Sequence, residues 1–224
     1  YNRISQLPKS QLERGVITAS AGNHAQGVAL SGQKLGITAI IVMPKTTPDI
    51  KVQAVKRLGG QVVLHGDSFD VANKYAIQRA KDEGMTFIPP YDDELVMAGQ
   101  GTIANEILRQ WRDVEYVFVA VGGGGLIAGV AAYLGDVAPH VKVIPVEYDE
   151  SACLKAAFEA NKRVILPSVG LFADGTAVAQ IGEKPFEVIQ LQKSDNSGPI
   201  VERDVILVNT DEICAAIKDT YDEC

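Results

Sequence analysis

The sequence predicts an α/β fold with parallel sheets. Strand-like runs alternate with helix-like runs over most of the 224 residues. The strand-like runs are continuously apolar, as strands that are buried on both faces should be. Hydrophobic residues make up 46 % of the chain, which is enough for a sizeable core. Successive strand–helix–strand units of this kind place parallel strands side by side through right-handed crossovers.

The strand-like runs can be placed in order, with helices between them. They cover residues 15–19, 38–43, 61–66, 86–90, 116–121 and 142–147. The clearest helix pattern spans 67–84, where Asp67 or Ser68 can cap the start and Gly84 can end the helix. The regularity weakens after about residue 165. A last strand and helix are expected in 204–223, with Thr210 or Asp211 as the cap.

Charge and cysteine content exclude several classes of function. The net charge of −7 argues against nucleic acid or an anionic membrane as the main partner. The chain has three cysteines, which is too few for a disulfide framework and fits a reducing compartment. Cys153 and Cys214 lie on helix patterns, and we expect them to be packed. No cluster of Cys and His has the spacing of metal ligands, so no metal site is expected.

Four consecutive glycines, Gly122 to Gly125, stand between a strand-like run and an apolar helix. Together they cost about 2–4 kcal/mol of extra ordering relative to alanine, since each costs roughly 0.5–1 kcal/mol. Their N–H groups at a helix start would form a phosphate site, and the alternative is tight packing alone. A loose dinucleotide pattern of Gly123, Gly125 and Ala128, with Glu147 as a ribose-binding acid, leaves an NAD-binding module as a rival.

A second polar turn follows the first strand-like run, in the segment SAGNHAQG. Singly, its residues are ordinary helix-start residues. Together they place free N–H groups, a hydroxyl, an amide and an imidazole at the carboxyl end of a parallel sheet, where ligands bind in such folds. The set suits a small carboxylate and a polar aromatic oxygen, and it offers nothing to the pyrophosphate of NAD. Its members are Ser20, Ala21, Gly22, Asn23 and His24.

Four segments, TASAGNHAQGVA, VGGGGLIAGVA, EYDESACLKAA and LFADGTAV, carry a family resemblance. In this order they resemble the biosynthetic threonine dehydratases, which are pyridoxal-phosphate enzymes of the tryptophan-synthase-β-like fold (fold type II). The resemblance implies dehydration and deamination of L-threonine to 2-oxobutanoate and ammonia, the first step of isoleucine biosynthesis. It covers nearly the whole chain.

The resemblance also implies roles for individual residues. Ser20, Ala21, Gly22 and His24 would surround the substrate carboxylate. Asn23 would bond the phenolic oxygen of pyridoxal 5'-phosphate, and Gly175 would lie near its ring. The cofactor phosphate would be held by Gly122, Gly123, Gly124, Gly125 and the N–H of Leu126. The lysine that binds the cofactor would precede Tyr1, so no catalytic residue is expected within these residues and the fragment alone is expected to be inactive.

The implied organisation is a truncated two-domain fold. A small α/β domain would span 16–92, and a large cofactor domain would comprise 1–15 and 93–224, with the cofactor in the cleft between them. Cys153 stands where metal-using relatives carry an acid, which argues against a cation site. The stretch Gln190 to Arg203 is polar, expected to be exposed, and longer than the family pattern.

Several alternatives stay open. A serine dehydratase or racemase of the same fold would show the same motifs, because they do not report on the pocket for the substrate's methyl group. An NAD-binding module and a non-catalytic relative of the same fold are further readings. We expect a small amino-acid substrate, threonine or serine, and a homo-oligomer, either a dimer or a tetramer. The expected compartment is the cytoplasm, or a plastid in a plant or alga.

Overall fold

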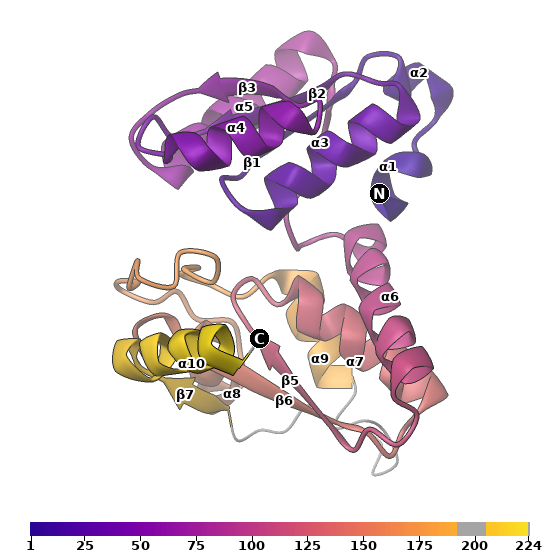
Figure 1. Ribbon diagram of the computed structural model, residues 1–224. Helices are drawn as coiled ribbons and strands as arrows, with labels where there is room; N and C mark the ends of the chain where they lie inside the picture. The colour runs from indigo at the N-terminus through magenta and orange to yellow at the C-terminus, as the bar shows by residue number, and fades with distance from the viewer. Residues whose placement is uncertain (192–204, 224) are drawn as a thin grey trace. The chain divides into compact units, whose positions relative to one another are not determined.

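The computed structural model describes residues 1–191 and 205–223, and its contacts divide the chain into two compact units (Figure 1). Unit 1 comprises Tyr1–Pro90 and unit 2 comprises Tyr91–Cys224. Residues 1–15 fall in unit 1, whereas the sequence assigned them to the large domain; the division into 16–92 and the remainder stays a prediction. Most of the stretch Gln190 to Arg203 lies outside the described residues, from 192 onward.

Unit 1 is built on a four-stranded parallel sheet with the strand order β3-β2-β1-β4. The strands are β1 (Val16–Ala19), β2 (Ala39–Met43), β3 (Gln61–Leu64) and β4 (Thr86–Phe87). The helices are α1 (Asn2–Ser5), α2 (Lys9–Leu12), α3 (Asn23–Leu35), α4 (Asp49–Arg57) and α5 (Phe69–Glu83). The predicted strands at 15–19, 38–43 and 61–66 are therefore present, and only the start of 86–90 is a strand.

Helices cover both faces of the central strands in unit 1. Helices α3 and α4 lie on one face, and α5 lies on the other (Figure 1). All residues of β1 and β2 are buried, as continuous apolar strands should be. The edge strand β3 has only exposed and half-buried residues, so its predicted burial on both faces is wrong. The α5 helix approaches closely because it presents three small buried residues, Ala72, Ala76 and Ala80, to the sheet. This packing fixes the carboxyl end of β1, where the polar turn begins.

Unit 2 is built on a three-stranded parallel sheet with the strand order β5-β6-β7. The strands are β5 (Tyr116–Ala120), β6 (Lys142–Tyr148) and β7 (Ile206–Val208). The helices are α6 (Glu94–Gln110), α7 (Gly125–Val137), α8 (Cys153–Ala160), α9 (Glu183–Leu191) and α10 (Thr210–Glu223), with the short 3-10 helix η1 (Asp149–Ser151). Helix α7 packs against α6 and α9 and against the sheet, so it is the centre of this unit.

Strand β5 alternates between exposed and buried residues, so its predicted burial on both faces is wrong. Val117 and Val119 belong to the core that α7 completes. Tyr116 and Phe118, on the other face, are 52 % and 63 % exposed. Among the described residues the packing of α7 therefore covers one face of this strand. The sequence could not show this, because β5 is apolar at every position.

The predicted capping residues are confirmed for α5 and wrong for α10. Ser68 caps α5 by accepting the Val71 N–H, and Gly84 ends that helix in the left-handed conformation, as predicted. At α10 the predicted caps Thr210 and Asp211 are wrong. The Asn209 side chain accepts the Glu212 N–H at 3.0 Å, and the Glu212 carboxylate accepts the Asn209 N–H at 2.8 Å, which is a capping box.

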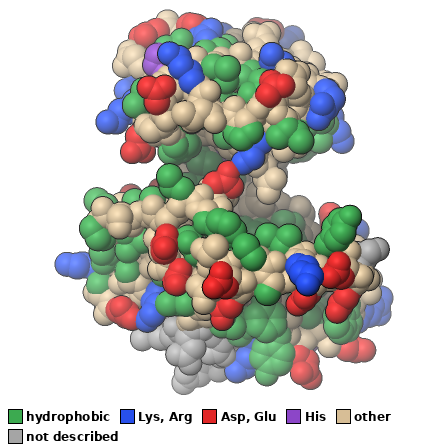
Figure 2. All heavy atoms as spheres, turned by 60° about the vertical axis from the view of Figure 1, so that its left-hand side comes forward, with side chains coloured by type: hydrophobic (Ala, Val, Ile, Leu, Met, Phe, Trp, Pro, Cys, Tyr) green, Lys and Arg blue, Asp and Glu red, His purple; other side chains and the backbone are tan. Residues whose placement is uncertain are grey.

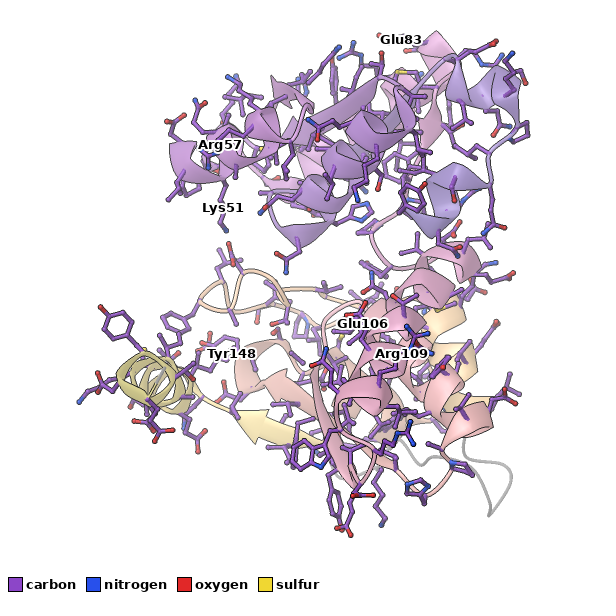
Figure 3. All side chains as sticks on the ribbon, turned by 45° about the vertical axis from the view of Figure 1, so that its right-hand side comes forward. Lys51, Arg57, Glu83, Glu106, Arg109 and Tyr148 are labelled. Carbon is purple, nitrogen blue, oxygen red and sulfur yellow. The ribbon has the colours of Figure 1, made fainter. Side chains whose placement is uncertain are left out.

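The start of α10 is also tied to the sheet. Tyr148, labelled in Figure 3 at the end of β6, has its hydroxyl 2.9 Å from Thr210 Oγ1. Its ring lies 6.4 Å from the ring of Phe172. Tyr148 is therefore a link between β6, α10 and the segment that precedes α9.

Surface charge and helix hydrophobicity can be described for the residues that the structure covers. On the face that Figure 2 shows, acidic and basic side chains are interspersed over both units. That face offers no broad basic surface of the kind that nucleic-acid binding requires. Within residues 1–191 and 205–223, no helix combines the length and hydrophobicity needed to cross a bilayer.

Candidate functional site

The turn from Ser20 to His24 connects β1 to α3 in unit 1. Helix α3 begins at Asn23, and its N-cap is Gly22, which has no side chain to bond the first-turn N–H groups. Ser20 Oγ instead accepts the Gly22 N–H at 3.2 Å. Asn23 is exposed and lies at the first helical position. The start of α3 is thus open to an external acceptor, and the helix dipole favours an anion there.

The surroundings of Gly22 support this openness. A Cβ atom built on Gly22 would meet nothing within 4 Å. The first helical bond of α3 runs from the Gln26 N–H to the Gly22 carbonyl, at 3.4 Å. The N–H groups of Asn23, His24 and Ala25 precede that bond, and no hydrogen bond found outside helices and strands in the described part of the chain has them as donors. These donors match the predicted site for a small carboxylate.

His24 uses its imidazole within unit 1. Its Nε2 lies 3.0 Å from Thr18 Oγ1 and 3.1 Å from the Ile88 carbonyl oxygen. Thr18 Oγ1 donates its own proton to Ile88 O at 2.7 Å, so it can only accept from the ring. Nε2 therefore carries the proton. Burial of the ring lowers the pKa of His24 to about 4, because desolvation disfavours the charged form.

This arrangement changes what His24 can offer a ligand. At neutral pH the imidazole is uncharged, and its one N–H points to the ends of β1 and β4. A direct hydrogen bond from that N–H to a substrate carboxylate would require its hydrogen bonds to Thr18 and Ile88 to break. The predicted place of His24 beside the carboxylate stays a prediction, and it rests on the backbone N–H rather than on the side chain.

The glycine loop in unit 2 is closely packed from one side by Tyr91. A Cβ atom on Gly123 would lie 2.2 Å from Tyr91 Cδ1, and one on Gly125 would lie 2.9 Å from Tyr91 Cα. Real Cβ atoms essentially never approach other atoms this closely. Tight packing, the alternative weighed from the sequence, therefore requires glycine at both positions.

The other two glycines meet different neighbours. A Cβ atom on Gly122 would lie 2.9 Å from Thr176 Cα, and one on Gly124 would lie 2.9 Å from Ile181 Cγ1. Gly124 is the N-cap of α7 and has a φ of 87°, in the left-handed region that favours glycine. The structure thus brings the glycine loop against the segment that contains Gly175. A Cβ atom on Gly175 itself would meet nothing within 4 Å.

Three carbonyl groups of this loop, those of Gly122, Gly123 and Gly124, are held by the protein. The Gly122 carbonyl oxygen accepts a hydrogen bond from the Cys153 thiol, with Sγ 3.3 Å from the oxygen. The Gly123 carbonyl accepts the Gly182 N–H, and the Gly124 carbonyl accepts the Ala128 N–H, each at 3.0 Å.

The opposite edges of these peptide groups carry donors. No peptide bond between described residues is cis. In a planar trans peptide the N–H points opposite to the C=O of the same group. The N–H groups of Gly123, Gly124 and Gly125 therefore point away from the protein groups that bond the carbonyls. Among the described hydrogen bonds outside helices and strands, none has these N–H groups as donors.

These three N–H groups have no acceptor in the described part of the chain and belong to buried residues, where polar groups are rarely left unpaired. Gly123, Gly124 and Gly125 are all buried, and they stand at the start of the 13-residue helix α7. Convergent N–H groups at a helix start bind phosphate. The residues present therefore fit the phosphate of the cofactor that the sequence implies, with the donors supplied by main chain alone.

Glu147 does not fit the role that the NAD-binding alternative gives it. The side chain is 1 % exposed. Its two carboxylate oxygens accept the N–H groups of Leu154 at 2.8 Å and Lys155 at 2.9 Å, at the start of α8. Burial raises the pKa of Glu147, and the two N–H groups partly offset that rise. A carboxylate engaged in this way is not available to a ribose hydroxyl.

Tyr91 and Thr176 are the neighbours that sequence reasoning missed. Both contact the glycine loop from more than 30 residues away along the chain, and no local pattern marks them. Asp92, next to Tyr91, accepts the N–H groups of Glu183 at 3.1 Å and Lys184 at 2.9 Å at the start of α9. The segment after Pro90 is thereby fixed to both the loop and α9.

Two further features bear on the site. A hollow of about 370 Å³ in unit 2 is lined by Asp149, Glu150, Ala152 and the segment 166–170. Its acidic lining does not suit an anionic ligand. In the described ranges, no three His, Cys, Asp or Glu side chains come together as a metal site would require. Cys153 is buried as expected, but Cys214 is exposed, so the expectation that both are packed is wrong for Cys214.

Comparison with known proteins agrees with these features. The family model described as "Pyridoxal-phosphate dependent enzyme" matches residues 1–224. The chain is 56 % identical over 223 residues to the threonine dehydratase of Nicotiana attenuata, covering 100 % of this chain and 36 % of that protein. It is 53 % identical over 222 residues to the L-threonine dehydratase biosynthetic IlvA of Haemophilus influenzae, covering 99 % and 42 %. It is also 53 % identical over 224 residues to the threonine dehydratase 1 biosynthetic, chloroplastic, of Solanum lycopersicum, covering 100 % and 36 %.

Solved structures give the same result. The processed form of threonine deaminase isoform 2 from Solanum lycopersicum matches with a TM-score of 0.91 and 50 % identity, over 100 % of this chain and 62 % of that one. Maize serine racemase matches with a TM-score of 0.89 and 31 % identity, over 98 % and 64 %. The predicted fold type II class is thereby confirmed.

The chain spans about two fifths of the length of the curated relatives that it matches. The match of the family model over residues 1–224, together with identity above one half over the whole chain, shows its membership. This chain belongs to the family of pyridoxal-phosphate dependent enzymes.

Proposed function

We propose that the protein containing this chain converts L-threonine to 2-oxobutanoate and ammonia, as the first step of isoleucine biosynthesis. The observation that carries the proposal is the identity of 53–56 % to threonine dehydratases over the whole chain. The unpaired donors of the glycine loop and the open start of α3 support it, since both suit the anionic groups of this reaction's cofactor and substrate.

Each unit contributes its own residues to the proposed chemistry. In unit 2, the N–H groups of Gly122 to Leu126 hold the cofactor phosphate, and Gly175 leaves room near the ring. In unit 1, Asn23 donates to the phenolic oxygen of the cofactor. The turn from Ser20 to His24 fixes the substrate carboxylate through N–H groups, which orients the Cα–H bond for its removal. Pyridoxal phosphate, when bound, supplies an electron sink for the charge left at Cα.

The test uses the purified full-length protein. We expect the visible absorbance of bound pyridoxal phosphate, and release of 2-oxobutanoate and ammonia from L-threonine. Phosphate-free pyridoxal should restore the apoprotein far less well than the phosphorylated cofactor. A protein that stays colourless with added pyridoxal phosphate, or that binds NAD instead, contradicts the proposal.

Serine chemistry is the second candidate, and the likeness to maize serine racemase favours it. The glycine loop and the α3 turn serve either substrate, because the groups proposed to bind there, the cofactor phosphate and the amino-acid carboxylate, are the same for threonine and serine. We expect a higher kcat/KM for L-threonine than for L-serine, and no D-serine. Chiral analysis of the product from L-serine separates dehydration from racemisation, and D-serine as the main product would overturn the preference.

Gly22→Ala gives a sharp prediction for the carboxylate turn. The added methyl group meets nothing within 4 Å in the protein, so the free energy of unfolding should change by less than about 0.5 kcal/mol. The methyl group would narrow the open space at the start of α3, where the proposed carboxylate binds. We therefore expect KM for L-threonine to rise about tenfold or more, as the loss of roughly 1.4 kcal/mol of carboxylate binding requires.

The matched control is Gly27→Ala, on the same helix, where an added Cβ also meets nothing within 4 Å. It should leave KM unchanged. An equal KM in wild type and Gly22→Ala would remove the turn from the substrate site without affecting the proposed phosphate loop.

Assembly and compartment are part of the same proposal. We propose a homo-oligomer, a dimer or tetramer, which light scattering of the full-length protein would measure; a monomer at working concentration would contradict it. A chloroplastic relative exists in Solanum lycopersicum. A plastid location is accordingly proposed for a plant or algal source, and the cytoplasm otherwise.

A further inference from the structure

A buried thiol lies directly behind the glycine loop. Cys153 is the first residue of α8, and its side chain is fully buried. Its thiol donates to the Gly122 carbonyl, with Sγ at 3.3 Å from the oxygen. The proposed reaction has no step that uses this thiol.

The bond acts on a peptide group that carries one of the phosphate donors. The Gly122 carbonyl and the Gly123 N–H belong to one planar unit, so holding the carbonyl fixes the direction of the N–H. The next two carbonyls of the loop are held by the backbone N–H groups of Gly182 and Ala128. Among these three carbonyls, the one of Gly122 is bonded to a side chain, and its orientation can therefore be changed by substitution.

Cys153 is itself fixed and stays protonated. The Glu147 carboxylate accepts the N–H groups of Leu154 and Lys155, which anchors the first turn of α8. Burial, together with the charge of Glu147, raises the pKa of the Cys153 thiol to about 12. The thiol therefore keeps its proton throughout the neutral range, as a hydrogen-bond donor must.

We propose that Cys153 is a positioning residue: its thiol orients the Gly122–Gly123 peptide so that the Gly123 N–H faces the cofactor phosphate. This inference rests on the proposed function, because it assumes that the loop binds that phosphate. Its consequence is specific. Removal of the thiol donor should weaken binding of the phosphorylated cofactor and leave binding of the same ring without phosphate nearly unchanged.

The experiment measures Kd for pyridoxal phosphate and for pyridoxal on the full-length apoprotein. Cys153→Ala and Cys153→Val remove the donor, the latter without leaving a cavity, and Cys153→Ser keeps a donor. We expect Kd for pyridoxal phosphate to rise about threefold to tenfold in the Ala and Val variants, as loss of one hydrogen bond implies. Kd for pyridoxal should change less than twofold, and Ser should restore most of the loss.

A second readout reports the phosphate itself. The ³¹P chemical shift of the bound cofactor should move in Cys153→Ala and Cys153→Val and return toward the wild-type value in Cys153→Ser. Cys214→Ala is the matched control, because Cys214 is exposed on α10. It should change neither Kd nor the chemical shift.

The outcomes separate the inference from the function. If wild type does not bind pyridoxal phosphate, the proposed function fails. Suppose instead that wild type binds pyridoxal phosphate. If the Ala and Val variants then have wild-type Kd values for pyridoxal phosphate and pyridoxal, or if both Kd values rise equally, the positioning role is wrong and the function stands. If Cys153→Ala does not fold, the ratio of the two Kd values in the Val and Ser variants decides the question.

Discussion

Replacing Gly123 with alanine should abolish tight binding of pyridoxal phosphate and destabilise the protein. The new Cβ would lie 2.2 Å from Tyr91 Cδ1, and the ring has little room to retreat, because Tyr91 also lies against Gly125 and Gly182. Overpacking of this kind costs about 3 kcal/mol. If the loop moves instead of the ring, its N–H groups leave their positions, and Kd should rise about a hundredfold or more for a loss of that size.

Urea unfolding and cofactor titration of the full-length protein measure the two effects. The control Gly27→Ala places the same methyl group on α3 in open space, where it should be neutral or stabilising by up to about 1 kcal/mol. The second control is a double variant. In a Tyr91→Ala background the cost of Gly123→Ala should shrink, since the clash has been removed. An equal cost in both backgrounds would show that Tyr91 is not the obstacle.

The glycine loop shows how far sequence reasoning reached. The ordering cost of Gly122 to Gly125 predicted that something must approach the main chain closely, and left ligand and protein as the candidates. The structure supplies a protein neighbour for each missing side chain. The N–H groups of Gly123 to Gly125 nevertheless have no described acceptor, so packing and ligand binding are not exclusive. One edge of each peptide is held, and the other is available.

The neighbours themselves could not be predicted. Tyr91 and Thr176 come from opposite sides of the loop in sequence, and only the tertiary packing of unit 2 brings them together. Glu147 illustrates the same limit. Its position at the end of a strand-like run was right for a ribose-binding acid, yet the start of α8 occupies both carboxylate oxygens. A local pattern places a residue at the correct end of a sheet, and it does not reveal which partner takes the side chain.

The burial of the strands was also predictable only in part from the sequence. In unit 1, continuous apolar runs predicted burial on both faces. Strands β1 and β2 confirm it because helices lie on each side, whereas the edge strand β3 has no buried residue. In unit 2, the equally apolar β5 has one exposed face. The hydrophobicity of a strand determines which of its faces can be buried. The arrangement of the helices determines which of those faces are covered. The sequence holds the first kind of information locally and the second only through the whole fold.

His24 should make the stability of the protein depend on pH in the mildly acidic range. The pKa is about 4 in the folded chain, against 6.5 for an ordinary histidine. The unfolded chain therefore takes up a proton first as the pH falls, so the contribution of His24 to stability is complete above pH 6.5 and is lost between 6.5 and 4. The difference in pKa corresponds to a loss of about 3 kcal/mol.

The structural cause of the loss is the burial of the His24 ring, which disfavours its charged form. The neutral ring joins the start of α3 to Thr18 on β1 and to Ile88 after β4. The variant His24→Gln keeps an N–H donor for Ile88 but has no group that titrates in this range. Urea unfolding of wild type and His24→Gln at pH 7, 5.5 and 4 should show curves that diverge as the pH falls, with wild type losing more stability. Parallel curves would contradict the prediction, because they would mean that the buried ring is protonated as readily in the folded chain as in water, although desolvation disfavours its charged form.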